Sequence, residues 1–379
     1  IIKEGKITEY GNYDVNGNPG YKIEAIGMPE EKRIDYTYDP RFAKKIMTIT
    51  EPSVYADRKK VTTYTYDDMG NLTRLLVEGF QPDGTPVSRQ VTMQYNGPFN
   101  QLTRIDGPRT DVQDLTSLEY YPNDPAEGAN RARLRRVIAG GIIVRDNIQY
   151  TPTGKVASEQ RATGQSLLYT YYPGNDRLAT LTIADGVTSR TTRWSYLPTG
   201  EVETITQADG TPESTTVTLT YDDARRLIGI TDHIGNNIKY QHDTAGNRIE
   251  ETVWNSSGTL AHARRQVYDE LNRLTQTIGA AGQTTSYGYD ANGNRINTTD
   301  ANNNPTRSAF DALNRLITVT DALNGTAQYA YDNRDNLTAV TDPNGNTTSY
   351  AYDDLGNLLS RTSPTPAPPP SPMTRPAMS

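Results

Sequence analysis

Several short stretches of the chain alternate tyrosine with small or polar residues, which is the pattern of a half-buried β-strand. The clearest are residues 286–289 (Ser-Tyr-Gly-Tyr), 328–331 (Gln-Tyr-Ala-Tyr) and 349–352 (Ser-Tyr-Ala-Tyr). In such a strand Tyr329 and Tyr331 lie on one face of a sheet and Ala330 lies on the other. No segment shows a sustained apolar period of about 3.6 residues, so the pattern indicates strands rather than helices.

The residues after each stretch have the chemistry of a tight turn. They read Asp-x-x-Gly/Asn-Asn/Arg, in which aspartate accepts from a backbone N–H two residues on and glycine or asparagine adopts a positive φ. A second strand then begins at a leucine, as at Leu316 and Leu337, and a second turn follows, as at residues 342–346 (Asp-Pro-Asn-Gly-Asn). One unit is therefore predicted to be a β-hairpin with a connecting turn.

This unit recurs along most of the chain. Five copies follow one another at intervals of 21 residues, beginning at Tyr268, Tyr289, Phe310, Tyr331 and Tyr352. Upstream the spacing loosens to between 21 and 29 residues, with motif positions at 66, 95, 121, 150, 172, 196, 221 and 242. A unit that cannot bury its face alone must stack on its neighbours. We therefore predict an all-β repeat array of antiparallel hairpins, about thirteen or fourteen in number, that curls into part of a β-shell.

The chain divides into three parts on this reading. Residues 1–60, with weaker echoes of the motif at Tyr13 and Tyr38, are expected to form a divergent β entry region that reads like the interior of something longer. Residues 61–363 are expected to form the repeat array, which is regular from about residue 221. Residues 364–379 are Pro-rich and are expected to be a disordered tail.

The tail leaves the repeat pattern abruptly, and we expect it to be a frame-shifted reading of the next repeat. If each codon is read from the third base of the preceding one, the residues after Pro364 can spell Thr-Tyr-Asp-Ala-Ala-Gly-Asn. The aspartate is forced, because the Met373 codon ends in G and the Thr374 codon begins with AC. The tyrosine codon would straddle positions 372 and 373, which is 21 residues after Tyr352. The alternative is a genuine Pro-rich linker, and the DNA sequence decides between the two.

Tyrosine dominates the aromatic residues, since the chain has 25 Tyr against 4 Phe and 2 Trp. A tyrosine ring supplies apolar area while its hydroxyl stays hydrogen-bonded, so a thin sheet can cohere without a thick aliphatic core. If the ring of Tyr331 is buried between hairpins, its replacement by alanine should cost about 3–5 kcal/mol. The net charge of −7 is small for 379 residues, which argues against a disordered chain.

The residues that carry the motif closely resemble the Rhs, or YD-repeat, family. The resemblance is specific from about residue 221 to residue 358 and looser back to about residue 66. The motif positions, which we expect to be structural, are Tyr66, Asp67, Gly70, Asn71, Tyr221, Asp222, Tyr268, Asp269, Tyr289, Asp290, Gly293, Asn294, Phe310, Asp311, Tyr331, Asp332, Tyr352, Asp353, Gly356 and Asn357.

The resemblance implies a non-catalytic wall segment of a hollow β-shell, which in bacterial polymorphic toxins encloses a toxic C-terminal domain. It implies as partners the remainder of the shell and an enclosed polypeptide, and a secreted, cell-surface or delivered location. The alternative is an adhesion module that binds glycans or a neighbouring cell, as related surface proteins and teneurins do. Family members also carry a self-cleaving segment rich in Asp-Pro-x-Gly; residues 342–345 have that sequence, and we interpret them as a connecting turn.

Candidate chemistry outside the repeat motif is sparse. The recurring aspartates could be calcium ligands, but they lack the order and closing glutamate of an EF-hand, which favours a role in the turns. His233, His242 and His262 lie in different units and form no triad or metal-site spacing. The pI near 5.2 argues against nucleic acid, and the longest apolar run, residues 137–144, is too short to span a membrane. We therefore expect no catalytic, cofactor-binding or metal-binding residues.

Overall fold

The computed structural model describes residues 2–3, 6–109 and 111–364, and it is almost entirely β-strand. The described part contains one short helix, the six-residue 3₁₀ segment η1 (Pro125–Asn130). The strands are β1 (Ile2–Lys3), β2 (Lys6–Ile7), β3 (Glu9–Gly11), β4 (Tyr21–Glu24), β5 (Lys32–Tyr38), β6 (Ile46–Pro52), β7 (Lys59–Tyr66), β8 (Leu72–Phe80), β9 (Pro86–Tyr95), β10 (Leu102–Asp106), β11 (Thr116–Tyr120), β12 (Leu134–Ala139), β13 (Ile142–Tyr150), β14 (Val156–Arg161), β15 (Ser166–Tyr171), β16 (Leu178–Ala184), β17 (Ser189–Tyr196), β18 (Val202–Gln207), β19 (Thr215–Tyr221), β20 (Leu227–Thr231), β21 (Asn237–His242), β22 (Arg248–Trp254), β23 (Leu260–Tyr268), β24 (Leu274–Gly279), β25 (Thr284–Tyr289), β26 (Arg295–Thr299), β27 (Pro305–Phe310), β28 (Leu316–Thr320), β29 (Thr326–Tyr331), β30 (Leu337–Thr341), β31 (Thr347–Tyr352) and β32 (Leu358–Thr362).

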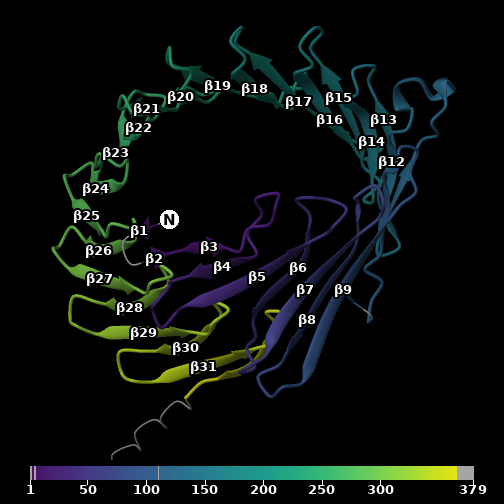
Figure 1. Ribbon diagram of the computed structural model, residues 1–379. Helices are drawn as coiled ribbons and strands as arrows, with labels where there is room; N and C mark the ends of the chain where they lie inside the picture. Colours follow the sequence, from purple (N-terminus) through teal and green to yellow (C-terminus); the bar gives the residue numbers. More distant parts are fainter. Residues whose placement is uncertain (1, 4–5, 110, 365–379) are drawn as a thin grey trace, which may run out of the picture.

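Strands β3 to β32 form one antiparallel strip, in which each strand pairs with its neighbours in sequence. Strands β1 and β2 form a separate two-stranded sheet. The strip bends into a ring, and its last strands, drawn in yellow, come to lie beside the early strands β6–β8 (Figure 1). The all-β fold and the curled sheet predicted from the sequence are confirmed.

The strip has two rims, because consecutive antiparallel strands turn alternately at one side and the other. We call the side with the Tyr-Asp turns, such as residues 67–71 and 353–357, the motif rim. We call the side with the connecting turns between hairpins, such as residues 53–58 and 342–346, the linker rim. At the motif rim the pairing register shifts by one residue directly before the motif tyrosine, as between Ala330 and Tyr331 and between Ala351 and Tyr352. The regular bulge marks the end of every such hairpin ladder.

The sheet is one layer thick, and its two faces differ in chemistry. On one face Trp194 lies opposite Ile205, and Tyr329 lies opposite Val340. Tyr329 and Tyr331 are half-buried while Ala330 is exposed, as the alternation predicted. The other face carries facing threonine pairs whose hydroxyls lie within 3.1 Å of each other, namely Thr37–Thr48, Thr170–Thr180, Thr182–Thr191, Thr206–Thr216, Thr320–Thr326 and Thr341–Thr347.

Cross-strand pairs therefore stabilise this sheet in place of a thick core. Few apolar side chains of the described residues are fully buried, and Ile148 is the largest of them. None of the described helical residues forms a segment long and apolar enough to cross a membrane.

The looser spacing upstream has a structural cause. Strands β8 and β9 contain 9 and 10 residues, whereas β30 and β31 contain 5 and 6. The 29 residues between the motif positions Tyr66 and Tyr95 therefore hold a hairpin with longer strands. The division into entry region, array and tail stays a prediction. The expected disorder and frame shift of the tail fall on residues 365–379, which lie outside the described residues.

Candidate functional site: the seam that closes the strip

Each motif aspartate organises its own turn. In the last repeat one carboxylate oxygen of Asp353 accepts from the backbone N–H groups of Leu355 and Asn357, both at 2.9 Å, and the other accepts from the Asn357 side chain at 2.8 Å. The same pattern holds at the other predicted motif aspartates, which are Asp67, Asp222, Asp269, Asp290, Asp311 and Asp332. These bonds favour the role in turns over a role as calcium ligands.

The hydrogen bonds also lower the pKa of several of these carboxyl groups. The side chain of Asn71 lowers the pKa of Asp67, and the backbone N–H of Arg273 lowers the pKa of Asp269. A carboxylate is stabilised by donors that its protonated form would lose. The three predicted motif glycines, Gly70, Gly293 and Gly356, adopt φ of 82°, 88° and 81°, which closes the turn without strain.

At several repeats the motif tyrosine ties its hairpin to the one before it. The hydroxyl of Tyr331 donates to the carbonyl oxygen of Leu316 at 2.9 Å, which is the first residue of the second strand in the preceding hairpin. Tyr66, Tyr221 and Tyr289 donate to the equivalent carbonyls of earlier hairpins at 2.7–2.9 Å. Burial raises the pKa of Tyr66, Tyr221 and Tyr331. Phe310 stands at this position without a hydroxyl.

A second ladder, which was not predicted from the sequence, runs along the motif rim. The guanidinium of Arg315 bonds Asp311 of its own turn at 2.7 Å and the carbonyl of Asp332 in the next turn at 3.0 Å, and it lies 4.8 Å from the ring centre of Tyr331. Arg273 makes the same contacts one repeat pair earlier, with Asp269, Asp290 and Tyr289. The sequence does carry a signal for this ladder, because arginine and asparagine alternate at the position four residues after the motif aspartate, between residues 226 and 336.

The feature that sets one part of the strip apart is a seam, where the motif rim of the last three hairpins meets the linker rim of the first strands. The turns at 311–315, 332–336 and 353–357 face the loop 25–31, the loop 52–58 and the end of β8. The two edge strands, β3 and β32, have one partner each among the described pairings. The ring is therefore closed through side chains and loop backbone at this seam.

Asp354 is the centre of the seam and has no exposed surface. Its carboxylate accepts from the backbone N–H groups of Val54 and Phe80, both at 2.8 Å, and from the hydroxyl of Ser53. Its own backbone N–H donates to the carbonyl of Phe80 at 2.9 Å. One residue of the last turn thus joins the loop after β6 to the end of β8.

The space for Asp354 depends on a glycine in β8. A Cβ atom at Gly79 would lie 2.3 Å from the Cβ atom of Asp354, so any larger residue there would collide with it. The guanidinium of Arg334 lies 3.6 Å from the Asp354 carboxylate and adds a positive charge to the same buried place. The carboxylate therefore sits in a closely fitted pocket of donors.

The remaining direct contacts spread along the seam. The Asn333 side chain donates to the Ser53 carbonyl at 3.2 Å, and Arg334 donates to the Pro52 carbonyl at 3.3 Å. Lys32 pairs with Asp335 at 3.2 Å, and Arg89 reaches the Asn357 side chain at 3.3 Å. These direct contacts therefore come from two consecutive turns of the motif rim, at 332–336 and 353–357.

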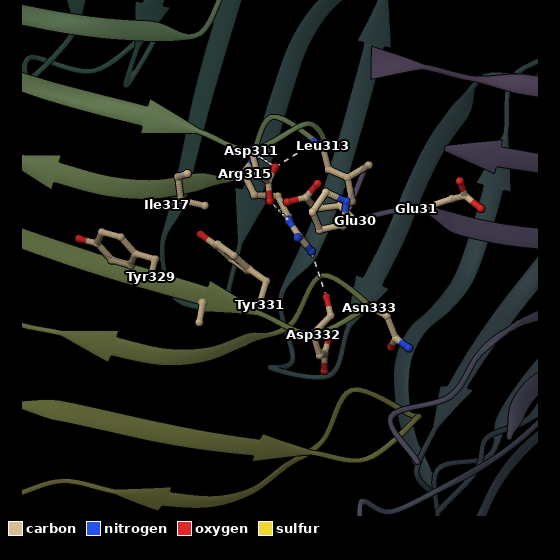
Figure 2. A pocket seen from close by; sticks show the side chains of 12 residues that line it. Glu30, Glu31, Asp311, Leu313, Arg315, Ile317, Tyr329, Tyr331, Asp332 and Asn333 are labelled. Carbon is tan, nitrogen blue, oxygen red and sulfur yellow. Dashed lines mark hydrogen bonds and ion pairs between the residues drawn. The ribbon is translucent and has the colours of Figure 1, made fainter. Parts of the chain in front are cut away.

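Two hollows open where the seam meets the loop 25–31. One, of about 300 Å³, lies between Pro29–Glu31 and the residues around Arg315 and Tyr331. The other, of about 320 Å³, lies between Met28 and the turns at 290–294 and 310–312. Figure 2 shows Glu30 beside the Asp311–Arg315 pair, with Leu313 above it. The seam is thus tight at Asp354 and gapped toward Met28.

The structure places the predicted motif residues along the whole rim and brings only those of the last four hairpins to the seam, where Asp290 and Asn294 line the second hollow. Asp311, Tyr331 and Asp332 line the first hollow, and Asp353 and Asn357 flank the buried Asp354. The residues that form the centre of the seam, Ser53, Gly79 and Asp354, were not among the predicted positions. Local sequence gives no signal for them, because a second aspartate also follows the motif aspartate at positions 68 and 223.

Comparison with known proteins gives a family match and a fold match. Residues 268–305, 310–347 and 334–366 match the RHS Repeat family. No curated protein matches the chain by sequence. Among solved structures, TcdB2-TccC3 without its hypervariable C-terminal region is 16% identical over 95% of this chain and 22% of that one, with a TM-score of 0.61.

Two further structures give the same result. TcdB2-TccC3-TEV is 15% identical over 93% of this chain and 23% of that one, with a TM-score of 0.56. TcdB2-TccC3-Cdc42 is 15% identical over 95% of this chain and 24% of that one, with a TM-score of 0.55. The chain therefore spans about a quarter of the length of the structures it resembles. At such identities the likeness concerns the fold.

Proposed function

Since residues 268–305 and 310–366 match the RHS Repeat family, we propose that the strip is a wall segment of a hollow shell that encloses a polypeptide. Its role is structural, and it contributes no catalytic group of its own. Its partners are the rest of such a shell and the enclosed chain. By the same reasoning its place of action is outside the cell that makes it, at a cell surface or after delivery.

The observation that carries this proposal is the closed ring. A wall must return on itself, and here the last three hairpins are held against the first strands by the buried carboxylate of Asp354. The tyrosine bonds between hairpins give the wall its coherence along the strip, and the seam gives coherence across it. The solved structures with the same fold come from assemblies of much longer chains, which suits a segment of a larger enclosure.

The adhesion alternative gains less from the structure. The hydroxyls of Tyr66, Tyr221, Tyr289 and Tyr331 donate to backbone carbonyls, and burial raises the pKa of three of them. Tyrosines used in this way hold hairpins together and offer less of their polar edge to a sugar. We therefore favour enclosure of a polypeptide over adhesion.

Protection of a tethered polypeptide tests the proposal. A flexible reporter with one protease site is fused after residue 379, and its cleavage rate is compared in the wild type, in Asp354→Ala and in Asp68→Ala. We expect slow cleavage in the wild type and in Asp68→Ala, and cleavage at least about ten-fold faster in Asp354→Ala, which opens the seam. Equal, fast cleavage in all three proteins would contradict enclosure.

A further inference from the structure

The strip builds the same loop twice on its linker rim. Residues 25–31 read Ala-Ile-Gly-Met-Pro-Glu-Glu, and residues 208–214 read Ala-Asp-Gly-Thr-Pro-Glu-Ser. Ala25 and Ala208 both adopt a positive φ, of 52° and 51°. In both loops the fourth residue donates its N–H to the carbonyl of the first, and the seventh donates to the fourth, at 3.0–3.1 Å. The two loops therefore share both sequence and backbone.

The first of these loops faces a turn from another part of the strip. Loop 25–31 and the turn that follows Phe310 line two hollows together, with Met28 and Ala312 at one and Glu30, Leu313 and Arg315 at the other. Figure 2 shows Glu30 next to this turn. Loop 25–31 thus shows what such a loop receives, namely a Tyr/Phe-Asp-x-Leu-Asn-Arg turn from the motif rim of another part of the strip.

The second loop is free. Thr211 and Glu213 are exposed, and a hollow of about 450 Å³ lies beside them. Ile183, which lines the same hollow, is 38% exposed. Loop 208–214 therefore has the backbone form of loop 25–31, but no motif-rim turn of the described residues lines its hollow.

The chain also holds a free counterpart of the turn that faces loop 25–31. Residues 268–273 read Tyr-Asp-Glu-Leu-Asn-Arg, against Phe-Asp-Ala-Leu-Asn-Arg at 310–315. Leu271 is 70% exposed, whereas the equivalent Leu313 is half-buried in the seam. Turn 268–273 belongs to the motif rim and loop 208–214 to the linker rim, so the two point to opposite sides of one strip. A seat and its matching turn are thus displayed on opposite rims.

We propose that loop 208–214 is a docking seat for turn 268–273 of a second copy of this chain. Two copies stack rim on rim, and the contact continues the seam that already joins loop 25–31 to turn 310–315. Because seat and turn are different surfaces, the contact is head-to-tail and leaves a free seat and a free turn at the ends. The proposal goes beyond the wall role, and its failure would leave the seam within one chain unaffected.

Chemical cross-linking tests the contact, because the chain contains no cysteine. Glu213→Cys in one copy and Leu271→Cys in a second, affinity-tagged copy are mixed and treated with a short bis-maleimide reagent. The equivalent residues in the seam, Glu30 and Leu313, line one hollow. The double variant Glu30→Cys/Leu313→Cys therefore reports within each molecule that the seam geometry is intact.

The control pairs Glu213→Cys with Leu168→Cys, whose side chain is 51% exposed on a strand of the sheet face, away from both rims. We expect the Glu213–Leu271 pair to give at least about five-fold more mixed dimer than the control pair at equal concentration. Association through the outer edges of β3 and β32, which have no partner among the described strands, would give similar yields from both cysteine pairs. Equal yields from the two pairs, with the seam pair still cross-linked, would overturn the proposal.

Discussion

Two turns of the strip have almost the same sequence and very different surroundings. Residues 66–72 read Tyr-Asp-Asp-Met-Gly-Asn-Leu, and residues 352–358 read Tyr-Asp-Asp-Leu-Gly-Asn-Leu. Their internal hydrogen bonds agree, as do the φ angles of Gly70 and Gly356, at 82° and 81°. Yet the Asp68 side chain is 99% exposed, while its equivalent Asp354 is fully buried.

The comparison separates what the motif decides from what the strip decides. Seven residues are enough to fix a turn, because the aspartate and glycine satisfy the backbone locally. Whether the next aspartate faces water or a seam depends on which other winding of the strip lies beside it. Asp68 forms only a surface pair with Arg41 at 2.9 Å, whereas Asp354 receives three donors from segments about 300 and 274 residues away in the chain.

The largest loss of stability is expected when Asp354, the buried member of this pair, is replaced. Asp354→Ala leaves the hydroxyl of Ser53 and the N–H groups of Val54 and Phe80 without their acceptor, which should cost about 3 kcal/mol or more. Asp68→Ala should cost less than about 1 kcal/mol, because exposed ion pairs contribute little. Urea unfolding, together with hydrogen exchange of residues 52–56 and 78–81, measures both variants. Similar small losses in the two variants would show that the seam does not hold the ring.

A glycine in β8 offers a second way to open the seam without removing a hydrogen bond. Gly79→Ala places a methyl group 2.3 Å from the Cβ atom of Asp354, and such overpacking should cost about 1–3 kcal/mol. The cost should nearly vanish when Gly79→Ala is made in the Asp354→Gly protein, since the colliding side chain is then gone. A double-mutant cycle by urea unfolding gives this coupling. Additive losses would mean that Gly79 matters for β8 itself and not for the seam.

The tyrosine bond between hairpins should contribute less per residue. The ring of Tyr331 is half-buried, so Tyr331→Ala is now expected to cost about 2–3 kcal/mol, below the 3–5 kcal/mol expected for a buried ring. Tyr331→Phe removes only the bond to the Leu316 carbonyl and should cost about 1 kcal/mol. His233→Ala, at an exposed turn position, serves as the control with almost no expected loss. Equal losses for Tyr331→Phe and Tyr331→Ala would place the whole contribution in the hydroxyl.

Much of the fold could be predicted because each hairpin is determined by neighbouring residues in the sequence. The alternation around Tyr329 and the Asp-x-x-Gly-Asn turns specify hairpins without reference to the rest of the chain. The arginine ladder could have been found, since Arg273 and Arg315 stand at one motif position, but its partner is in the next repeat. The seam could not be found, because Asp68 and Asp354 are indistinguishable within their turns. The difference between them arises only when the curvature of thirty strands brings the ends together.

The smallest expected effect per residue is the loss of folding stability at low pH. It tests the hydrogen bonds within the turns. The side chains of Asn71, Asn247 and Asn346 lower the pKa of Asp67, Asp243 and Asp342 below the usual value of 3.8. A carboxyl group with a lowered pKa in the folded state stabilises the fold above its unfolded pKa. This stabilisation is lost as the pH falls through the folded value.

Stability should therefore be flat with respect to these groups above about pH 5 and should fall with decreasing pH below about pH 4. Single replacements would be hard to resolve, so the triple variant Asp67→Asn/Asp243→Asn/Asp342→Asn is the useful one. It should be less stable than the wild type at pH 7 and should lose less of its stability between pH 5 and pH 3. Urea midpoints across this range give the comparison. An unchanged slope in the triple variant would mean that these three turns, two on the motif rim and one on the linker rim, do not depend on ionised aspartate.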